Sequence, residues 1–207
     1  MSLHDYIDEI LGSRASIGVL KTLLRYRGKI FTIRELARTS GLSHPEVSLV
    51  VRNLEGRGVL RRQVVGRAHR VVLNEDSYVL RSMVEPLVKA EENTLCSLAS
   101  TIRPYFSGKG VTSVALFGSV SKGAETRSSD IDILIIADNR ELASECAARA
   151  SSAAASTFGR GLSPLVMSRS QFVRSRRRDL VGSILKSYIM VYGRELTKVV
   201  EDGKISR

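Results

Sequence analysis

The sequence predicts an α+β protein of two parts joined by a helical segment, and three observations lead to this prediction. Short helical patterns in the first third end in a pair of β-branched runs. A longer apolar stripe at three- and four-residue steps follows, and two apolar runs then precede an alanine-rich stretch. We therefore expect a first domain over residues 1–75, a connecting helix over 76–108 and a second domain over 109–207.

The first third is predicted to hold three helices. The earliest has its apolar residues on one face. The other two begin with a capping box, in which a hydroxyl and a carboxylate three residues apart satisfy free backbone N–H groups. These capping boxes are Thr32 with Glu35 and Ser43 with Glu46. The predicted helices cover residues 15–27, 33–39 and 44–56.

A basic β-hairpin is predicted at 59–74, directly after the helices. Two β-branched runs flank the turn sequence Gly66-Arg67-Ala68. The tip and the arms of this hairpin carry Arg61, Arg62, Arg67 and Arg70.

Together, a helix, two capped helices and a basic hairpin resemble the winged-helix domains of bacterial and archaeal transcription regulators. The resemblance implies that the second capped helix enters the major groove of double-stranded DNA and that the hairpin contacts the DNA backbone. The implied DNA-binding residues are Ser43, His44, Ser48 and Arg52 on the helix, and Arg67 and Arg70 on the hairpin.

The charge of the first third favours DNA as its partner. The whole chain has a net charge of +11. Residues 13–73 contain 13 Lys and Arg against three acids, so most of this excess lies in one segment. Each neutralised phosphate releases counterions and adds salt-dependent affinity. Two alternatives stay open: a winged helix that docks a protein, and a basic surface without a partner.

Two aspartates head the second apolar run of the second domain. Residues 111–117 and 130–136 are each predicted to be strands, and the second is a continuous apolar run headed by Asp130 and Asp132. Side chains alternate along a strand, so these carboxylates point the same way. At about 4 Å and an effective dielectric near 20, their repulsion costs on the order of 4 kcal/mol. A proton or a divalent cation between them would offset this cost; the alternative is solvated charge at a strand start.

The loop between the two runs has the components of a phosphate-binding turn. Gly118 leaves room for phosphate beside backbone N–H groups, and Ser119 adds a hydroxyl. Lys122 and Arg127 add positive charge. Carboxylate oxygens favour Mg²⁺ (or Mn²⁺), which is commonly shared with substrate phosphates. The sequence therefore predicts a nucleoside triphosphate (NTP) bound with a metal ion.

This motif resembles the minimal nucleotidyltransferases of the DNA polymerase beta superfamily. Their signature is an apolar residue and Gly-Ser, then roughly ten residues, then two aspartates that alternate with apolar residues. The matching residues here are Phe117-Gly118-Ser119 and Asp130-Ile131-Asp132-Ile133, with Lys122-Gly123 and Ser129 between them. The resemblance covers about residues 110–195.

The resemblance implies a small, largely antiparallel mixed sheet and a reaction in which a hydroxyl attacks the α-phosphorus and pyrophosphate leaves. Asp130 and Asp132 would be catalytic and would hold the metal ions. Active members usually carry a third carboxylate on a later strand. That strand is predicted at 162–168, after a helix over 140–157, yet the sequence has no Asp or Glu between Gly159 and Ser170.

Three functions stay open. The first is a metal-dependent nucleotidyltransferase coupled to DNA binding, whose acceptor is a protein, an RNA or a small molecule. The second is a DNA-binding regulator whose second domain binds nucleotide without catalysis, since loss of one metal ligand would lower the rate by powers of ten. The third is an interaction protein. The connecting stripe would pack within the chain or pair with its copy in a homodimer.

The C-terminal part is predicted to be helical and basic. A third capping box, Ser168 with Gln171, begins a short helix. A cluster of arginines follows over 174–178, for which a solvated face is the simpler interpretation and phosphate contact the alternative. A helix is expected over 179–191, and the last nine residues are expected to be partly disordered.

Composition points to a cytoplasmic protein with no membrane association. No apolar run reaches the roughly 18 residues of a membrane helix, and the first residues lack the pattern of a signal peptide. The two cysteines and three histidines match no zinc-binding spacing, and a disulfide is not expected.

Overall fold

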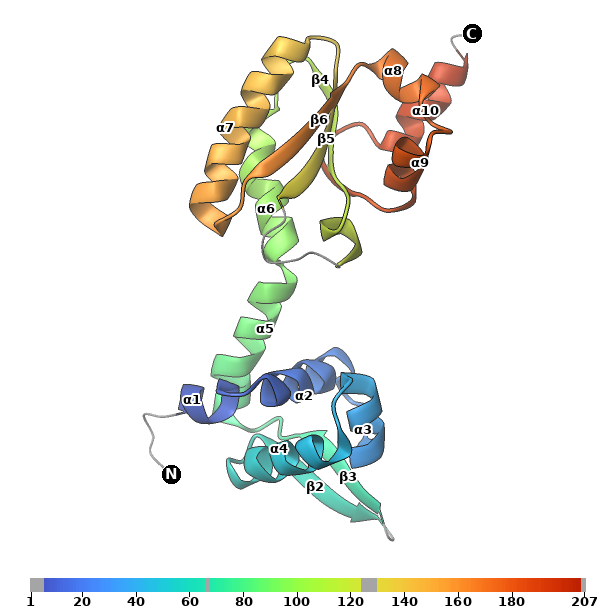
Figure 1. Cartoon of the computed structure of the whole chain (residues 1–207). Coiled ribbons are helices and arrows are strands. Elements are labelled where there is room, and N and C mark those ends of the chain that lie inside the picture. Colours follow the sequence, from blue (N-terminus) through green and yellow to red (C-terminus); the bar gives the residue numbers. More distant parts are fainter. Residues whose placement is uncertain (1–5, 66–67, 124–129, 206–207) are drawn as a thin grey trace. The chain divides into compact units, whose positions relative to one another are not determined.

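The chain divides into two compact units, Met1–Asn93 and Thr94–Arg207. The structure is a computed structural model that describes residues 6–65, 68–123 and 130–205 (Figure 1). The division falls inside the segment that was predicted to connect the two domains.

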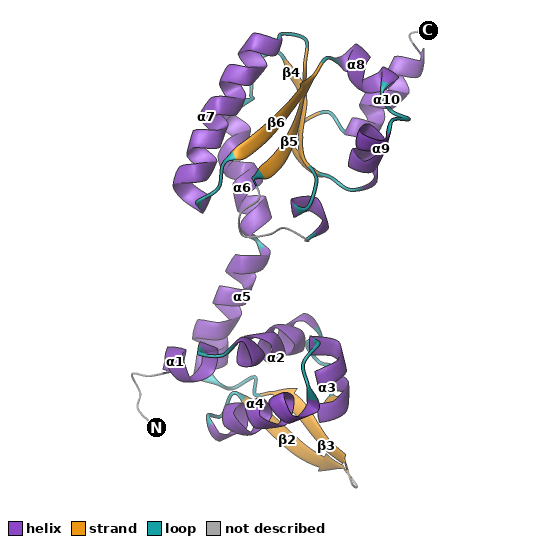
Figure 2. Cartoon of the chain, in the orientation of Figure 1, coloured by secondary structure: helices purple, strands orange, loops and turns teal. Residues whose placement is uncertain are grey.

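The first unit combines helices with a small antiparallel sheet of three strands in the order β1-β3-β2 (Figure 2). The predicted helices and the hairpin strands are present, and a two-residue strand pairs with the hairpin. The elements are α1 (Tyr6–Leu11), α2 (Arg14–Arg25), β1 (Phe31–Thr32), α3 (Ile33–Ser40), α4 (His44–Gly56), β2 (Leu60–Val65), β3 (Ala68–Leu73), a π-helical turn (Leu80–Val84) and α5 (Glu85–Glu92).

Capping boxes start α3 and α4, as the sequence predicts. The backbone N–H of Thr32 donates to Glu35 at 2.9 Å, and Glu35 N–H donates back to the threonine hydroxyl at 3.2 Å. Ser43 and Glu46 repeat the arrangement at the start of α4. These hydrogen bonds favour the ionised carboxylates, so they lower the pKa of Glu35 and Glu46.

The second unit is built on a four-stranded mixed sheet in the order β6-β5-β4-β7. Only β5 and β6 run parallel; the other pairs are antiparallel. The elements are α6 (Thr94–Ile102), a 3₁₀ turn (Arg103–Tyr105), β4 (Val111–Leu116), a second 3₁₀ turn (Val120–Lys122), β5 (Ile131–Ala137), α7 (Arg140–Phe158), β6 (Leu162–Met167), α8 (Arg169–Arg174), α9 (Asp179–Lys186), β7 (Ile189–Gly193) and α10 (Leu196–Ile205).

Helices cover both faces of this sheet, so β5 is buried on both sides. In Figure 1, α6 and α7 lie on one face, and α8, α9 and α10 lie on the other. Ile133 and Ile135 belong to the core with α6 and α7, whereas Leu134 and Ile136 belong to the core with α8, α9 and α10. Two covered faces explain why 133–137 is continuously apolar.

One prediction for the C-terminal part was wrong. The helix expected over 179–191 ends at Lys186, and Ile189–Gly193 is the edge strand β7. Backbone pairing with β4 stabilises this strand. The local pattern of apolar residues holds no information on this distant partner, and it therefore predicted a helix. Of the last nine residues, for which partial disorder was expected, 199–205 belong to α10 and Val199 is buried, whereas 206–207 lie outside the described residues.

Helices do not run unbroken through the segment predicted to connect the two domains. A π-helical turn precedes Glu85, and Pro86 lies in the first turn of α5. This is the position where a missing N–H costs least. α5 ends at Glu92 and α6 begins at Thr94.

Candidate functional site

The paired acids lie where β5 begins. Asp130 is exposed and directly precedes the strand, whereas Asp132 is its second residue and is half-buried. Ile131 and Ile133 face the core with α6 and α7. Alternation therefore directs Asp132 to the opposite face, which α8, α9 and α10 cover further along the strand.

Gly118 lies directly against Asp132. Its φ is +76°, a conformation that favours glycine, and a Cβ there would be 2.2 Å from Asp132 Oδ2. The neighbouring N–H of Phe117 donates to the Asp132 carbonyl at 3.0 Å, which holds the end of β4 beside the start of β5. No other residue type fits at position 118 without displacing the carboxylate. The predicted phosphate-binding turn and the predicted metal ligand are therefore in contact.

A second glycine, which the sequence analysis missed, lies beside Asp130. The N–H of Ile131 donates to the Gly161 carbonyl at 3.1 Å. A Cβ on Gly161 would be 3.8 Å from Asp130 Oδ1 and 3.4 Å from Ser151 Oγ. Ser151 accepts the N–H of Leu162 at 2.8 Å, so α7 fixes this turn. The only local signal was a glycine directly before a predicted strand.

A serine pair holds the turn that follows Gly118. Ser121 Oγ lies 3.1 Å from the Gly118 carbonyl and 3.1 Å from the Ser187 carbonyl. Ser187 Oγ lies 3.2 Å from the Ser121 carbonyl and 3.1 Å from Ser121 Oγ. We call these contacts the serine clasp. It ties the phosphate-binding turn to the junction between α9 and β7, and nothing in the local sequence marks Ser187 for this role.

Next to the serine clasp, Tyr188 packs against the core with α8, α9 and α10. Burial raises the pKa of its hydroxyl, which donates to Glu195 Oε2 at 2.8 Å; this hydrogen bond raises the pKa further. The residue after the clasp is thereby anchored to the segment before α10.

Within the described ranges, the two aspartates have no partner for their charge. Among the residues described, neither Asp130 nor Asp132 has a hydrogen-bond or ion-pair partner for its carboxylate. Two oxygen-rich groups beside a bare glycine turn fit a hard divalent cation such as Mg²⁺. Over the described ranges, no three Asp, Glu, His or Cys side chains come close enough to hold a metal ion together.

The position beside Asp132 on the parallel strand is occupied by Ser163. The register pairs these two residues, and paired residues of neighbouring strands share a face. A carboxylate on β6 at this position would stand next to the pair, and the chain has an exposed serine there.

The structure describes two of the three remaining predicted nucleotide-binding residues. Ser119 is half-buried, and its side chain makes no capping hydrogen bond to the 3₁₀ turn that it precedes. Lys122 ends that turn. Arg127 lies outside the described residues.

The predicted DNA-binding residues that the structure describes lie on α4, at its N-cap and on β3. His44 and Arg52 are exposed and Ser48 is half-buried, whereas the Ser43 hydroxyl is engaged in the capping box. Leu49, which the sequence analysis did not select, is 57% exposed on the same helix. Arg70 is exposed on β3, and Arg67 lies outside the described residues.

Other hairpin arginines have acidic partners. Arg61 pairs with Asp76 at 2.8 Å, and Arg62 pairs with Glu55. Their positive charge is therefore partly neutralised within the unit, whereas Arg52 and Arg70 have no ion-pair partner in the described part of the chain.

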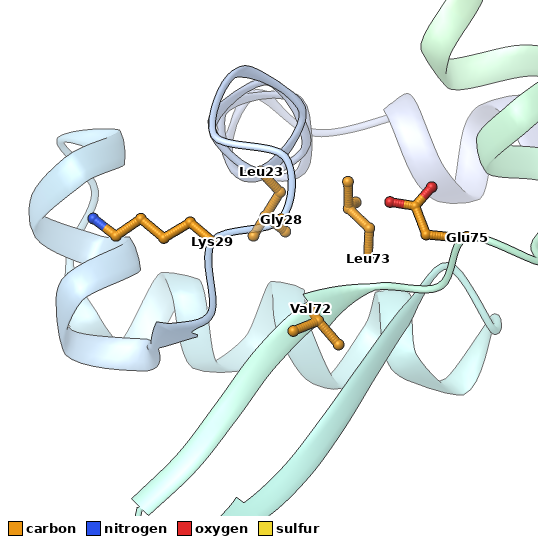
Figure 3. A pocket seen from close by; sticks show the side chains of 6 residues that line it. All are labelled: Leu23, Gly28, Lys29, Val72, Leu73 and Glu75. Atoms are coloured by element: carbon orange, nitrogen blue, oxygen red, sulfur yellow. The ribbon is translucent and has the colours of Figure 1, made fainter.

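A separate hollow of about 170 Å³ lies in the first unit between α2 and β3 (Figure 3). Its charged residues are Lys29 and Glu75, and Glu75 pairs with Arg27. This volume is below that of a typical small-molecule site, so the hollow offers no competing candidate.

Part of the second unit is similar to a known family. Residues 99–188 match the model of the nucleotidyltransferase domain family. This match includes Gly118, Asp130, Asp132 and both members of the serine clasp. Among curated proteins, none matches the chain.

Solved structures give weaker likenesses. One is a toxin-antitoxin with AMP-PNP (21% identity, 55% of this chain and 86% of that chain, TM-score 0.34). Another is TrmBL2, an archaeal chromatin protein that binds DNA (18% identity, 88% and 76%, TM-score 0.29). With identities near 20% and TM-scores below 0.5, these likenesses add nothing to the case for an activity.

None of the helices in the described ranges combines the length and the apolar character needed to cross a membrane.

Proposed function

We propose that the second unit transfers a nucleotide from an NTP to an acceptor hydroxyl in a metal-dependent reaction. The observation that carries the proposal is the contact between Gly118 and Asp132 within a segment that matches the nucleotidyltransferase domain family. This contact places a bare backbone turn, suited to phosphate, against an acid suited to a metal ion that accompanies phosphate.

Each residue has a distinct role in this proposal. Asp130 and Asp132 hold Mg²⁺ or Mn²⁺, which supplies charge neutralisation at the triphosphate. Gly118 and Ser119 receive the phosphates through backbone N–H groups and a hydroxyl, and Lys122 with Arg127 adds positive charge. The acceptor hydroxyl loses its proton to solvent water as its oxygen forms a bond to the α-phosphorus. The bond from that phosphorus to the bridging oxygen breaks, and pyrophosphate leaves.

The position of Ser163 supports a second candidate, in which this unit binds nucleotide and metal without catalysis. A family member with a third carboxylate would hold the catalytic metal ion with three acids, whereas here a serine lies beside Asp132. Loss of one such ligand lowers the rate by orders of magnitude and leaves much of the binding intact.

Pyrophosphate release separates the two candidates. The full chain would be incubated with each α-labelled NTP, Mg²⁺ or Mn²⁺ and candidate acceptors, and nucleotide binding would be measured in parallel. Release above that of a D130N/D132N variant supports the transferase. Metal-dependent binding with no release for any acceptor supports the second candidate. Absence of metal-dependent binding contradicts both.

We further propose that the first unit is a winged helix that binds double-stranded DNA through α4 and the hairpin. Exposed Arg52 and Arg70, without acidic partners in the described part of the chain, support this assignment. Binding of duplex DNA should weaken steeply as salt rises, because phosphate contacts release counterions. A flat salt response would contradict the assignment and favour protein docking.

A further inference from the structure

The turn between α8 and α9 concentrates positive charge in the second unit. Five arginines and no acid occur between Arg169 and Arg178. Two of the five belong to α8, and the other three lie in the turn at 176–178 that leads into α9. Such a density of like charge repels itself unless a polyanion neutralises it.

Three of these arginines are engaged within the unit. Arg169 pairs with Asp202 at 3.3 Å, Arg174 donates to the Ser170 carbonyl at 3.3 Å, and Arg176 donates to the Val173 carbonyl at 3.1 Å. The other two, Arg177 and Arg178, are exposed and make no hydrogen bond or ion pair through their side chains with any residue described.

The backbone under these two arginines is ordered by hydrogen bonds. Arg178 N–H donates to the Ser175 carbonyl at 2.9 Å, and Gly182 N–H donates to the Arg178 carbonyl at 2.8 Å. Two available guanidinium groups therefore stand on a defined turn, which reduces the entropy lost when they bind a ligand.

Helix α9 connects this turn to the candidate active site. It has eight residues, so it is about 12 Å long at 1.5 Å per residue. Its last residue is followed at once by Ser187, whose serine clasp holds the phosphate-binding turn. One stacked nucleic-acid strand advances about 3.4 Å per nucleotide, so this length corresponds to roughly four nucleotides.

We propose that Arg177 and Arg178 bind the backbone phosphates of a single-stranded polynucleotide whose terminal hydroxyl is the acceptor of the transferred nucleotide. The acceptor role rests on the proposed transferase function; the phosphate-binding role does not. Guanidinium groups bind phosphate in a bidentate manner. Leu180, 54% exposed in the first turn of α9, offers an apolar contact for a base.

Strand binding tests this proposal without any chemistry. The affinity of the full chain for labelled 12-nucleotide RNA and DNA strands would be measured by fluorescence anisotropy, with a DNA duplex as a third probe and without metal or NTP. The test variant is R177A/R178A. The matched control is K109A/R140A, which removes two exposed charges elsewhere in the same unit.

We expect R177A/R178A to weaken single-strand binding about tenfold and to reduce its salt slope by about 1.4, at about 0.7 for each lost phosphate contact. The control should change the affinity less than threefold, and duplex binding should change little in either variant. Weaker binding of both the RNA and the DNA strand identifies the phosphate backbone as the ligand, and weaker binding of RNA alone identifies a ribose backbone. Equal effects of both variants, or no effect, would overturn the proposal, as would equal competition by polyglutamate.

The acceptor role has its own readout. Labelled NTP should extend an oligonucleotide by one residue, a 3′-deoxy end should block this, and R177A/R178A should slow it about tenfold. Transfer to a protein alone would overturn the acceptor role. If D130N/D132N still binds strands while wild type shows no transfer at all, the transferase function fails and strand binding at the arginine turn stands.

Discussion

The exposed side of α4, for which we propose DNA binding, and the acidic edge of β5 are assembled from residues at very different separations along the sequence. The residues selected on α4 belong to one 13-residue helix, and its start is stabilised by a capping box whose two members are three positions apart. At β5, the predicted phosphate-binding turn is held by a clasp between residues 66 positions apart, and Gly118, just after β4, touches an acid on the next strand. Substitutions of the exposed side chains selected on α4, such as Arg52, should therefore change binding alone. Those around β5 should change folding and binding together.

The largest expected effect is on the acids themselves. D130N/D132N keeps the shape and removes the charge, so metal-dependent nucleotide binding should be lost and any transfer should fall on the order of a thousandfold. Isothermal titration with a non-hydrolysable NTP and Mn²⁺ measures this. D138N, on an exposed acid just past the other end of β5, is the control. Unchanged binding in the double variant would refute the assignment.

Gly118→Ala should both destabilise the fold and weaken nucleotide binding. The left-handed conformation costs a non-glycine residue about 1–2 kcal/mol, and the new Cβ also displaces the Asp132 carboxylate. Urea unfolding and nucleotide titration measure the two effects.

Gly123→Ala separates the effect of backbone strain from that of the collision with Asp132. Gly123 has φ +63° but nothing within 4 Å of a Cβ, so it shares the strain and lacks the collision. Nucleotide affinity should fall much further in G118A than in G123A; equal losses would mean that the contact with Asp132 is unimportant.

On α4, Arg52→Ala should weaken duplex DNA binding about five- to tenfold and lower the salt slope by about 0.9, with the free energy of unfolding unchanged. Arg81→Ala, exposed outside α4 and the hairpin, is the control. A loss of stability in R52A would contradict the idea that this surface is energetically separate from the fold.

Ser187→Ala should destabilise the chain by about 1 kcal/mol and weaken nucleotide binding several-fold, because the serine clasp then loses a hydroxyl. Ser183→Ala, exposed on α9, should do neither. A double-mutant cycle with S121A should show coupling in both quantities. Strict additivity would show that the two serines act independently.

The smallest effect concerns acid stability of the first unit. Hydrogen bonds lower the folded-state pKa of Glu35 and Glu46 below the unfolded value, about 4.3 for Glu. Their contribution to stability is therefore present above that pH and is lost as pH falls through the lowered values. In urea unfolding, the free energy of unfolding of E35Q/E46Q should fall less steeply than that of wild type between pH 5 and about pH 3, whereas E92Q should match wild type. A slope identical to wild type would contradict the capping assignment.

Local pattern predicted much of this molecule correctly. The capping boxes of α3, α4 and α8 were recognised from the spacing of their residues, because such caps depend on atoms within four residues. The Gly-Ser turn and the two aspartates were found in the same way, since they form a compact motif. The missing acid on β6 was also noted from the sequence, although its place beside Asp132 was not.

Tertiary structure decided what local pattern did not contain. Strand β7 forms because β4 offers it an edge, so its apolar residues were mistaken for a helical stripe. Gly161 and Ser187 reach the acidic edge only through the parallel β5–β6 pairing and the return of the chain after α9. The sequence by itself determined the chemical groups and their local geometry, because those depend on near neighbours. The folded chain determined which distant groups meet, because such contacts form only when the sheet and its two cores are complete.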